Sequence, residues 1–162
     1  MEILLKDKII LLTGASRGIG MSIAQALGEC QATVALHYGQ NREPAAKLAQ
    51  AIGHGSRAFQ ADLNDSLAAK SLVEEVRAAY GKIDVLINNA GIALAEEENL
   101  NFAQWTRIWE KTLQVNLISS AVLCHEVIPM MQRQGEGRIV HIASRAAFRG
   151  DTPAYMAYAA SK

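Results

Sequence analysis

The sequence has little cysteine and no excess of charge of either sign. Cys30 and Cys124 are its only two cysteines, and they lie far apart without metal-ligand spacing. Each sits in an apolar stretch typical of buried core, which favours a reduced, cytoplasmic setting. Sixteen Lys and Arg balance sixteen Asp and Glu. The composition therefore gives no electrostatic reason to expect nucleic acid or an anionic membrane as a partner.

Long hydrophobic runs are also missing. No apolar run reaches the roughly 18 residues that a membrane span needs. In the opening MEILLKDK, charged residues interrupt the apolar run too early for a secretory signal. A chain of 162 residues lies within the range of one ordinary domain. We therefore expect residues 1–162 to form a single soluble domain that binds neither nucleic acid nor a membrane.

Short apolar runs alternate with longer stretches of helical period along the whole chain. Parallel strands that are covered on both faces are almost continuously apolar, and the short runs have this character. The alternation predicts an α/β fold with a doubly wound parallel sheet of the Rossmann type. Ligands in such sheets bind beyond the carboxyl ends of the strands, where the strand order reverses. The predicted strands cover 8–14, 33–39, 57–61, 82–89 and 137–144, and the predicted helices cover 19–29, 43–52, 66–80, 105–134 and 154–162.

The loop after the first predicted strand is rich in glycine and reads TGASRGIG over residues 13–20. Its three glycines would let the backbone turn tightly, approach a pyrophosphate and pack helix against strand, with free amides and the helix dipole facing the anion. The spacing G-x3-G-x-G differs from the G-x-G-x-x-G of many dinucleotide binders. The glycines could therefore play the same physical roles, but the sequence fingerprint itself is not matched. A tight turn without a ligand is the alternative.

Four motifs follow one another along the chain: TGASRGIG, NNAG at residues 88–91, Ser144, and Tyr158-x-x-x-Lys162. Together they resemble the classical short-chain dehydrogenase/reductase family, in register from about residue 6 to residue 162. The glycine turn and the HYGQNREPA stretch resemble the 3-oxoacyl-carrier-protein reductase branch, a likeness shared with reductases of other substrates. The resemblance implies a homo-oligomeric oxidoreductase that needs no metal and reduces a small-molecule carbonyl to an alcohol with a nicotinamide cofactor.

The resemblance also implies which residues bind the cofactor. NAD-preferring members carry a carboxylate at the end of the second strand, where this sequence has Tyr38, and Arg17 is expected to bind the 2′-phosphate of NADP. NADP(H) is therefore the preferred cofactor, with NAD(H) possible. Asp62 and Leu63 are expected to contact the adenine, although a helix cap is a competing role for Asp62. The full expected set is Gly14, Ser16, Arg17, Gly18, Ile19, Gly20, Tyr38, Asp62, Leu63, Asn88, Ala90 and Gly91.

Catalysis is expected at Tyr158, with Lys162 one helical turn away. A phenol with a pKa near 10 exchanges protons poorly at neutral pH, and a lysine ammonium on the same helix face favours the phenolate. The resemblance assigns Ser144 as a hydrogen-bond donor to the substrate oxygen. It assigns Asn116, at a helix distortion, to hold a water in a proton relay to the lysine; a merely buried polar residue is the alternative. His141 is interpreted as packing.

The sequence ends at Lys162, at the start of the expected catalytic helix. Members of the family usually continue beyond this point, so we expect a C-terminally incomplete domain that represents part of a longer reductase or a fragment with weak or no activity. The short last helix should fray, and the fifth strand should be an open edge that invites association. A nucleotide-binding sensor or scaffold without turnover is the alternative function, and the intact Ser144, Tyr158 and Lys162 argue against it.

Overall fold

The computed structural model describes residues 4–162. Five strands form one parallel sheet in the order β3-β2-β1-β4-β5, so the strand order reverses between β1 and β4. This arrangement confirms the predicted doubly wound, Rossmann-like sheet. The strands are β1 (Ile9–Leu12), β2 (Thr33–Tyr38), β3 (Arg57–Gln60), β4 (Val85–Asn88) and β5 (Arg138–His141).

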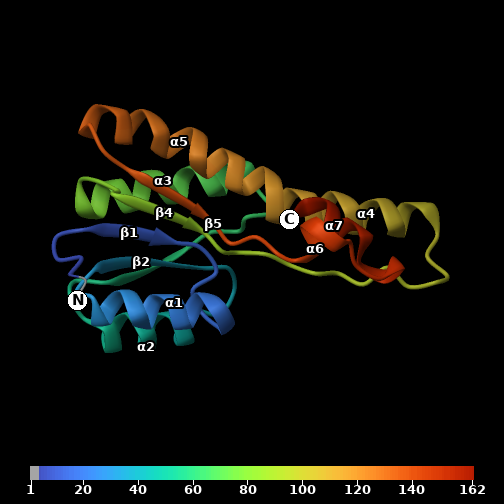
Figure 1. Ribbon diagram of the computed structural model, residues 1–162, viewed down its shortest axis with the longest axis horizontal. Helices are drawn as coiled ribbons and strands as arrows, with labels where there is room; N and C mark the ends of the chain where they lie inside the picture. Colours follow the sequence, from blue (N-terminus) through green and yellow to red (C-terminus); the bar gives the residue numbers. More distant parts are fainter. Residues whose placement is uncertain (1–3) are drawn as a thin grey trace.

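Helices lie on both faces of the sheet (Figure 1). The pair α1 and α2 covers one face, and the pair α3 and α5 covers the other, while α4, α6 and α7 lie beyond the carboxyl ends of the strands. The helices are α1 (Gly18–Glu29), α2 (Arg42–Ile52), α3 (Ser66–Tyr80), α4 (Phe102–Leu113), α5 (Ser119–Gln134), α6 (Ala146–Arg149) and α7 (Met156–Ser161).

The core consists of two apolar layers separated by the sheet. Alternate residues of β1 point to opposite faces, so Leu11 joins one layer, and Ile10 and Leu12 join the other. The Leu11 layer is closed by buried residues of α3 and α5 such as Val76 and Leu123. Because β1 is buried on both sides, its carboxyl end, which leads into the glycine turn, is held firmly in place.

The long predicted helix is continuous from Phe102 to Gln134, but it contains a π-helical turn. Asn101 and Gln104 form a capping box that starts α4 three residues earlier than expected. The π-helix η1 (Gln114–Ile118) then joins α4 to α5. By length and composition this helix could cross a membrane, contrary to our sequence-based expectation, but core helices pass the same test and α5 packs against α3 and β4. The finding is therefore weak evidence of a span.

The last helix is shorter than predicted, and a short helix before it was missed. A 3₁₀ turn, η2 (Pro153–Tyr155), occupies the start of the predicted 154–162 helix, because Pro153 begins the turn without continuing an α-helical ladder. The four-residue α6 was not predicted, since one turn is too short to show a helical period. Both segments follow β5 and lie beside the site described below.

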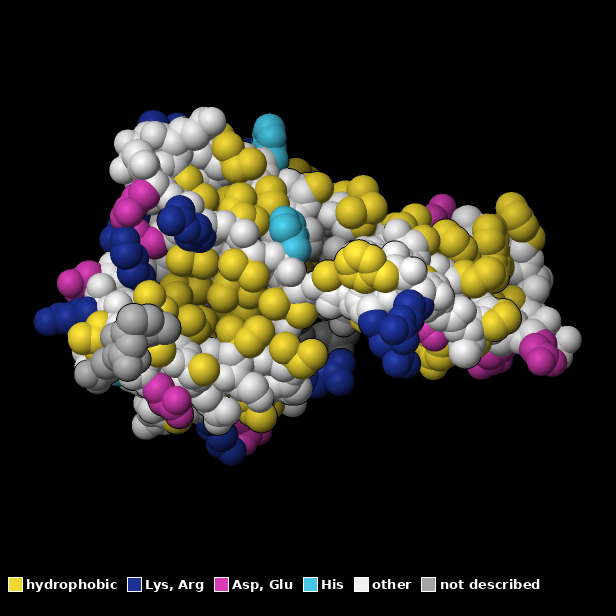
Figure 2. Space-filling view, viewed as in Figure 1, with side chains coloured by type: hydrophobic (Ala, Val, Ile, Leu, Met, Phe, Trp, Pro, Cys, Tyr) yellow, Lys and Arg dark blue, Asp and Glu magenta, His cyan; other side chains and the backbone are white. Residues whose placement is uncertain are grey.

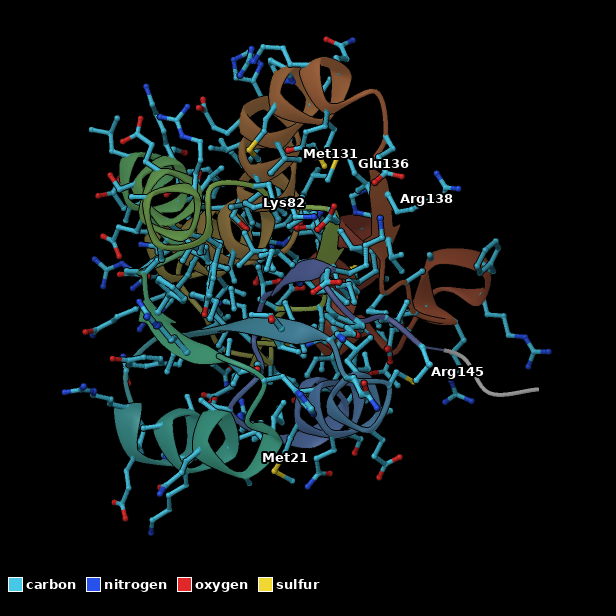
Figure 3. All side chains as sticks on the ribbon, turned by 90° about the vertical axis from the view of Figure 1, so that its left-hand side faces the viewer. Met21, Lys82, Met131, Glu136, Arg138 and Arg145 are labelled. Carbon is cyan, nitrogen blue, oxygen red and sulfur yellow. The ribbon has the colours of Figure 1, made fainter. Side chains whose placement is uncertain are left out.

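The sheet ends on β5, whose outer edge pairs with no strand among residues 4–162. The side chain of Val140 in this strand is 42% exposed. Figure 2 shows a broad hydrophobic area over the part of the sheet where Figure 1 places β1, β4 and β5. The amino end of β5 follows the end of α5. Four labelled side chains lie together there in Figure 3: Lys82, Met131, Glu136 and Arg138. The predicted open edge is thus present and partly apolar.

Candidate active site

The glycine turn after β1 and the NNAG motif after β4 lie side by side where the strand order reverses. The side chain of Asn89 donates hydrogen bonds to the carbonyl oxygens of Thr13, at 2.9 Å, and Gly14, at 3.1 Å. In return the hydroxyl oxygen of Thr13 accepts from the backbone N–H groups of Asn89 and Ala90, both at 3.0 Å. The turn after β1 and the segment after β4 are therefore joined by four hydrogen bonds, and Asn89 has a structural role.

The turn after β1 requires glycine at two positions. Gly14 has a φ of +65°, and a Cβ there would lie 2.9 Å from the Cα of Ala90. A Cβ on Gly20 would lie 2.2 Å from the carbonyl oxygen of Gly14, so α1 could not approach β1 as closely. These contacts support the tight turn and the close helix–strand packing that the sequence predicted.

The same turn is held by His37, in β2. Nδ1 of His37 accepts from the N–H of Gly14 at 3.1 Å, and Nε2 lies 3.0 Å from the carbonyl oxygen of Ala61. The neutral ring with its hydrogen on Nε2 satisfies both contacts. Burial lowers the pKa of His37 below its ordinary value, which favours this neutral form.

The start of α1 suits an anion. Its N-cap residue Arg17 makes no side-chain capping bond, and the first turn contains no acidic residue. The first N–H groups of a helix lack intrahelical partners, so those after Arg17 are left for a ligand. Ser16 is half-buried, whereas the side chains of Arg17 and Ile19 are exposed around the turn. These features fit the phosphates of a dinucleotide.

The end of β2 has no carboxylate facing the turn. Tyr38 is only 5% exposed, so its side chain is buried. The next acidic residue along the chain is Glu43, and its Oε1 lies 2.6 Å from Nζ of Lys47. Arg42 begins α2 and is exposed. Arg17 and Arg42 therefore meet no competing acid in this stretch of the chain.

The expected adenine-contacting pair follows β3. Asp62 is exposed, and its Oδ1 accepts from the N–H of Asn64 at 2.9 Å. The cap of α3 is Asp65, whose Oδ1 accepts from the N–H of Leu67 at 2.8 Å. The alternative of Asp62 as a helix cap is therefore wrong, and its second carboxylate oxygen stays available. Leu63 is buried.

Asn116 lies in η1, at the helix distortion that the sequence predicted. Its Oδ1 accepts from the N–H of Ile92 at 2.8 Å, and its Nδ2 donates to the carbonyl oxygen of Ile92 at 2.9 Å and to Oγ of Ser161 at 2.8 Å. Both amide hydrogens are thus engaged, and one lone pair of Oδ1 is left over. The side chain joins the segment after β4, the π turn and α7.

Lys162 and Asn116 come together beside Gly91. The position of a Cβ on Gly91 would lie 3.4 Å from Oδ1 of Asn116 and 3.7 Å from Nζ of Lys162. Partial burial lowers the pKa of Lys162 from its ordinary value, because desolvation disfavours the ammonium. Both side chains line a cavity of about 330 Å³, together with Asn88, Ala90 and Ser161.

Tyr158 and Ser144 are not among the residues that line this cavity. Tyr158 is half-buried in α7, one helical turn before Lys162. Ser144 follows β5, and its Oγ accepts from the N–H of Ala146 at 3.2 Å, so its own hydrogen is left to donate. The structure places all four expected catalytic residues beyond the carboxyl ends of β4 and β5.

A carboxylate that the sequence did not single out fixes the start of α7. Oε1 of Glu96 accepts from the N–H of Ala157 at 3.0 Å, and Oε2 accepts from Nε1 of Trp109 at 3.0 Å. The N–H of Glu96 donates to the carbonyl oxygen of Ala154 at 2.7 Å. Glu96 thus ties α4 to the helix that carries Tyr158. Its position in a loop of three consecutive acids gave no sequence signal for this role.

The parallel sheet, the glycine turn and the uncapped start of α1 at the switch point define a Rossmann-like, dinucleotide-binding type of domain. The chain belongs to the short-chain dehydrogenase family, because the family description "short chain dehydrogenase" matches residues 8–162. The predicted family resemblance is thereby confirmed.

Individual relatives agree with this assignment. D-threitol dehydrogenase of Mycolicibacterium smegmatis is 36% identical over 162 residues, which cover 98% of this chain and 60% of that protein. The 3-oxoacyl-acyl-carrier-protein reductase FabG of Staphylococcus aureus is 35% identical over 158 residues, covering 96% of this chain and 63% of that protein. The crystal structure of a metagenomic short-chain oxidoreductase in complex with NADP matches with a TM-score of 0.87 and 32% identity, covering 98% of this chain and 71% of that chain. The chain thus spans about 60% of the length of these curated relatives.

Proposed function

We propose that this chain supplies the cofactor site and the catalytic residues of an NADP(H)-dependent oxidoreductase that reduces a carbonyl to an alcohol. The observation that carries the proposal is the meeting of Asn116 and Lys162 beside Gly91, at the switch point of the sheet. Ligands of doubly wound sheets bind at this point. A half-buried lysine beside a buried amide is suited to chemistry that moves protons.

Each segment around the switch point has a proposed part in binding NADP(H). The turn residues Gly14, Ser16, Gly18, Ile19 and Gly20 hold the pyrophosphate, because their segment combines close backbone approach with unpaired N–H groups. The remaining contacts come from Arg17 at the 2′-phosphate, Tyr38 near the ribose, Asp62 and Leu63 at the adenine, and Asn88, Ala90 and Gly91 along the nicotinamide half. The absence of a carboxylate at the end of β2 supports NADP(H) over NAD(H), which remains the second candidate.

The catalytic residues have complementary proposed roles. Tyr158 gives a proton to the carbonyl oxygen, and Lys162, one turn away, stabilises the phenolate that results. Ser144 donates a hydrogen bond to the same oxygen as negative charge develops on it. Asn116 keeps Ile92 and α7 in place, and the free lone pair of its Oδ1 can hold a water that returns protons to Lys162. The bound cofactor supplies the hydride.

Two measurements test the proposal. NADPH and NADH are titrated into the protein, and turnover is followed with a panel of ketones, β-ketoacyl thioesters and quinones. We expect NADPH to bind more tightly, and Arg17→Ala to reduce this preference by about tenfold, whereas Arg42→Ala changes it less. Tyr158→Phe should keep nucleotide affinity and lose carbonyl reduction. A Tyr158→Phe protein that functions unchanged would instead support the sensor or scaffold alternative.

We further propose that the chain associates with copies of itself in a reducing, cytoplasmic setting. Membership of the short-chain dehydrogenase family, whose resemblance implies a homo-oligomer, supports association, and the two free cysteines support the setting. Light scattering on a sizing column should show species of at least about twice the intact mass of the same protein under denaturing conditions.

A further inference from the structure

Two consecutive N–H groups of the glycine turn are bonded to one residue of the neighbouring strand, His37. The N–H of Gly14 donates to Nδ1 of the ring at 3.1 Å, and the N–H of Ala15 donates to the main-chain carbonyl oxygen of His37 at 3.0 Å. Asn89 holds Gly14 from the other side, because its Nδ2 donates to the Gly14 carbonyl oxygen at 3.1 Å. The start of the turn is thus fixed between β2 and the segment after β4, and the first N–H groups of α1 remain for a ligand.

The same ring reaches the segment that follows β3. Nε2 of His37 lies 3.0 Å from the carbonyl oxygen of Ala61, and the N–H of Ala61 donates to the carbonyl oxygen of Tyr38 at 3.1 Å. Ala61 directly precedes Asp62 and Leu63, the residues proposed to contact the adenine. The imidazole therefore connects the segments proposed to bind the pyrophosphate and the adenine, which follow the two strands that flank β2.

Only one form of the ring satisfies both side-chain contacts. Nδ1 must carry a lone pair to accept from the N–H of Gly14, and Nε2 must carry the hydrogen to donate to Ala61. Proton uptake would place an N–H on both ring nitrogens, so that Nδ1–H would face the N–H of Gly14 and the ring or the turn would have to move. His37 is 3% exposed, so bulk water does not reach the contact to replace the lost acceptor.

No charged side chain in residues 4–162 offsets a proton on this ring. The residues that α1, α2 and α3 bury are all uncharged, β1 contains none that titrates, and Phe59 is the partner of His37 on β3. The nearest titratable groups are the buried Tyr38, the exposed Asp62 and, at the start of β3, the exposed Arg57. Burial lowers the pKa of His37, and the bond to a backbone carbonyl raises it only in part, so the ring is neutral at pH 7.

We propose that His37 is a positioning residue of the nucleotide site, whose neutral ring holds the pyrophosphate turn and the adenine segment in place together. The inference rests on the proposed NADP(H) site. A proton on the ring breaks the contact with Gly14, so the affinity for the nucleotide falls in mild acid. The phosphates attract a charged ring and act in the opposite direction, but they are proposed to bind at the start of α1 and not at the ring. The sign of the pH dependence therefore separates the two effects.

Ring titration in the wild-type protein tests this sign directly. The signals of the four histidine rings are followed by NMR between about pH 5 and 8, with and without saturating NADP⁺, which is more stable in acid than NADPH. His54 and His125 are exposed and serve as references. We expect NADP⁺ to lower the pKa of His37 further, because a ligand that prefers the neutral ring opposes proton uptake. An unchanged or raised pKa overturns the proposal.

Two substitutions separate the contacts of the ring. An asparagine keeps an acceptor near the place of Nδ1 but does not reach Ala61, whereas a glutamine keeps a donor near the place of Nε2 but offers Gly14 no acceptor. We expect His37→Asn to weaken NADP⁺ binding about two- to threefold at pH 8, and His37→Gln about tenfold. Between about pH 8 and 5, the wild-type affinity should fall at least about threefold more than that of either variant. Ionisation of the 2′-phosphate, near pH 6, is common to all three proteins and cancels.

His54 provides the matched control for the loss of a histidine. It is exposed between α2 and β3, and asparagine tolerates its φ of +49°, so His54→Asn should keep the affinity and the pH dependence of the wild type. Circular dichroism at each pH shows whether every protein is folded, and the wild-type ring titration decides where a variant is not.

The outcomes separate the positioning role from the proposed function. The role of His37 is overturned if the wild type and His37→Asn lose the same share of their affinity in acid, or if His37→Gln binds as tightly as the wild type at pH 8. In both cases the NADP(H) site itself stands, because the wild type binds the nucleotide. A wild-type protein that binds no NADP⁺ at pH 8 overturns the proposed function and this role with it.

Discussion

His37 holds Gly14 in place from the neighbouring strand. Its Nδ1 accepts from the N–H of Gly14 at 3.1 Å, and its Nε2 faces the carbonyl oxygen of Ala61 at 3.0 Å. A protonated ring has no lone pair left for Gly14. The first residue of the glycine turn is therefore coupled to the protonation state of a buried histidine.

This coupling predicts a loss of stability in mild acid. Burial lowers the folded-state pKa of His37 below the ordinary value of 6.5. The unfolded chain then takes up a proton at a higher pH than the folded one, so the stabilisation is complete above about pH 6.5 and is lost as the pH falls toward the folded-state pKa. Thermal unfolding between pH 5 and 8 measures it. His37→Gln should flatten the low-pH part of the curve, and parallel curves for the two proteins would contradict the role of His37.

The close approach of α1 to β1 predicts the effect of a methyl group at Gly20. The new Cβ would lie 2.2 Å from the carbonyl oxygen of Gly14 and 2.6 Å from Nδ2 of Asn89, so the turn must shift. We expect Gly20→Ala to cost about 1–3 kcal/mol of unfolding free energy and to weaken NADPH binding. Gly39→Ala is the control, because no atom lies within 4 Å of its Cβ position. Equal NADPH affinity in both variants would show that the approach does not matter.

Much of this fold could be predicted from the sequence, because its signals are local. The helix α3 has the predicted bounds: Asp65 caps its start, and Gly81, with a φ of +80°, ends it. The strand centres followed from apolar runs that are covered on both faces. The strand ends were predicted too long, because pairing with neighbours decides where a ladder stops. In β4, for example, the ladder covers only the second half of the predicted 82–89 segment.

The contacts across the sheet could not be predicted in this way. His37 meets Gly14, and Cys124 of helix α5 meets His141 of β5, only because the fold brings separate elements together. The sequence interpretation of Cys124 as buried core and of His141 as packing therefore missed the pair. Asn116 was found through a motif, but its bonds to Ile92 became visible only with the π turn in place.

A buried carboxylate at the amino end of β4 should contribute more to stability than any exposed ion pair. Asp84 is 4% exposed, accepts from the N–H of Ile9 at 2.7 Å and lies 3.0 Å from Nζ of Lys82. Asp84→Ala leaves that N–H without its acceptor, and we expect a loss of about 2 kcal/mol in urea unfolding. Glu136→Ala removes only an exposed partner of Lys8 and should have a small effect. Similar midpoints for the two variants would contradict this assignment.

Glu96 should control turnover without touching the substrate. Its two carboxylate oxygens accept from the N–H of Ala157 and from Nε1 of Trp109, which fixes the start of the helix that carries Tyr158. Glu96→Ala removes both contacts, so α7 should lose its orientation and kcat should fall by about ten- to a hundredfold. NADPH affinity should change little, because the glycine turn belongs to other elements of the fold.

The neighbouring acid provides the matched control for this prediction. Glu97 is exposed and makes no side-chain hydrogen bond in the described structure, so Glu97→Ala should leave kcat and KM unchanged. Glu96→Gln keeps one acceptor oxygen and should restore part of the rate, since one of the two contacts can still form. A lower kcat with unchanged NADPH affinity would point to the position of α7, because a general loss of folding would lower NADPH affinity together with kcat. A Glu96→Ala protein with normal kcat would show that the contacts of Glu96 do not position α7.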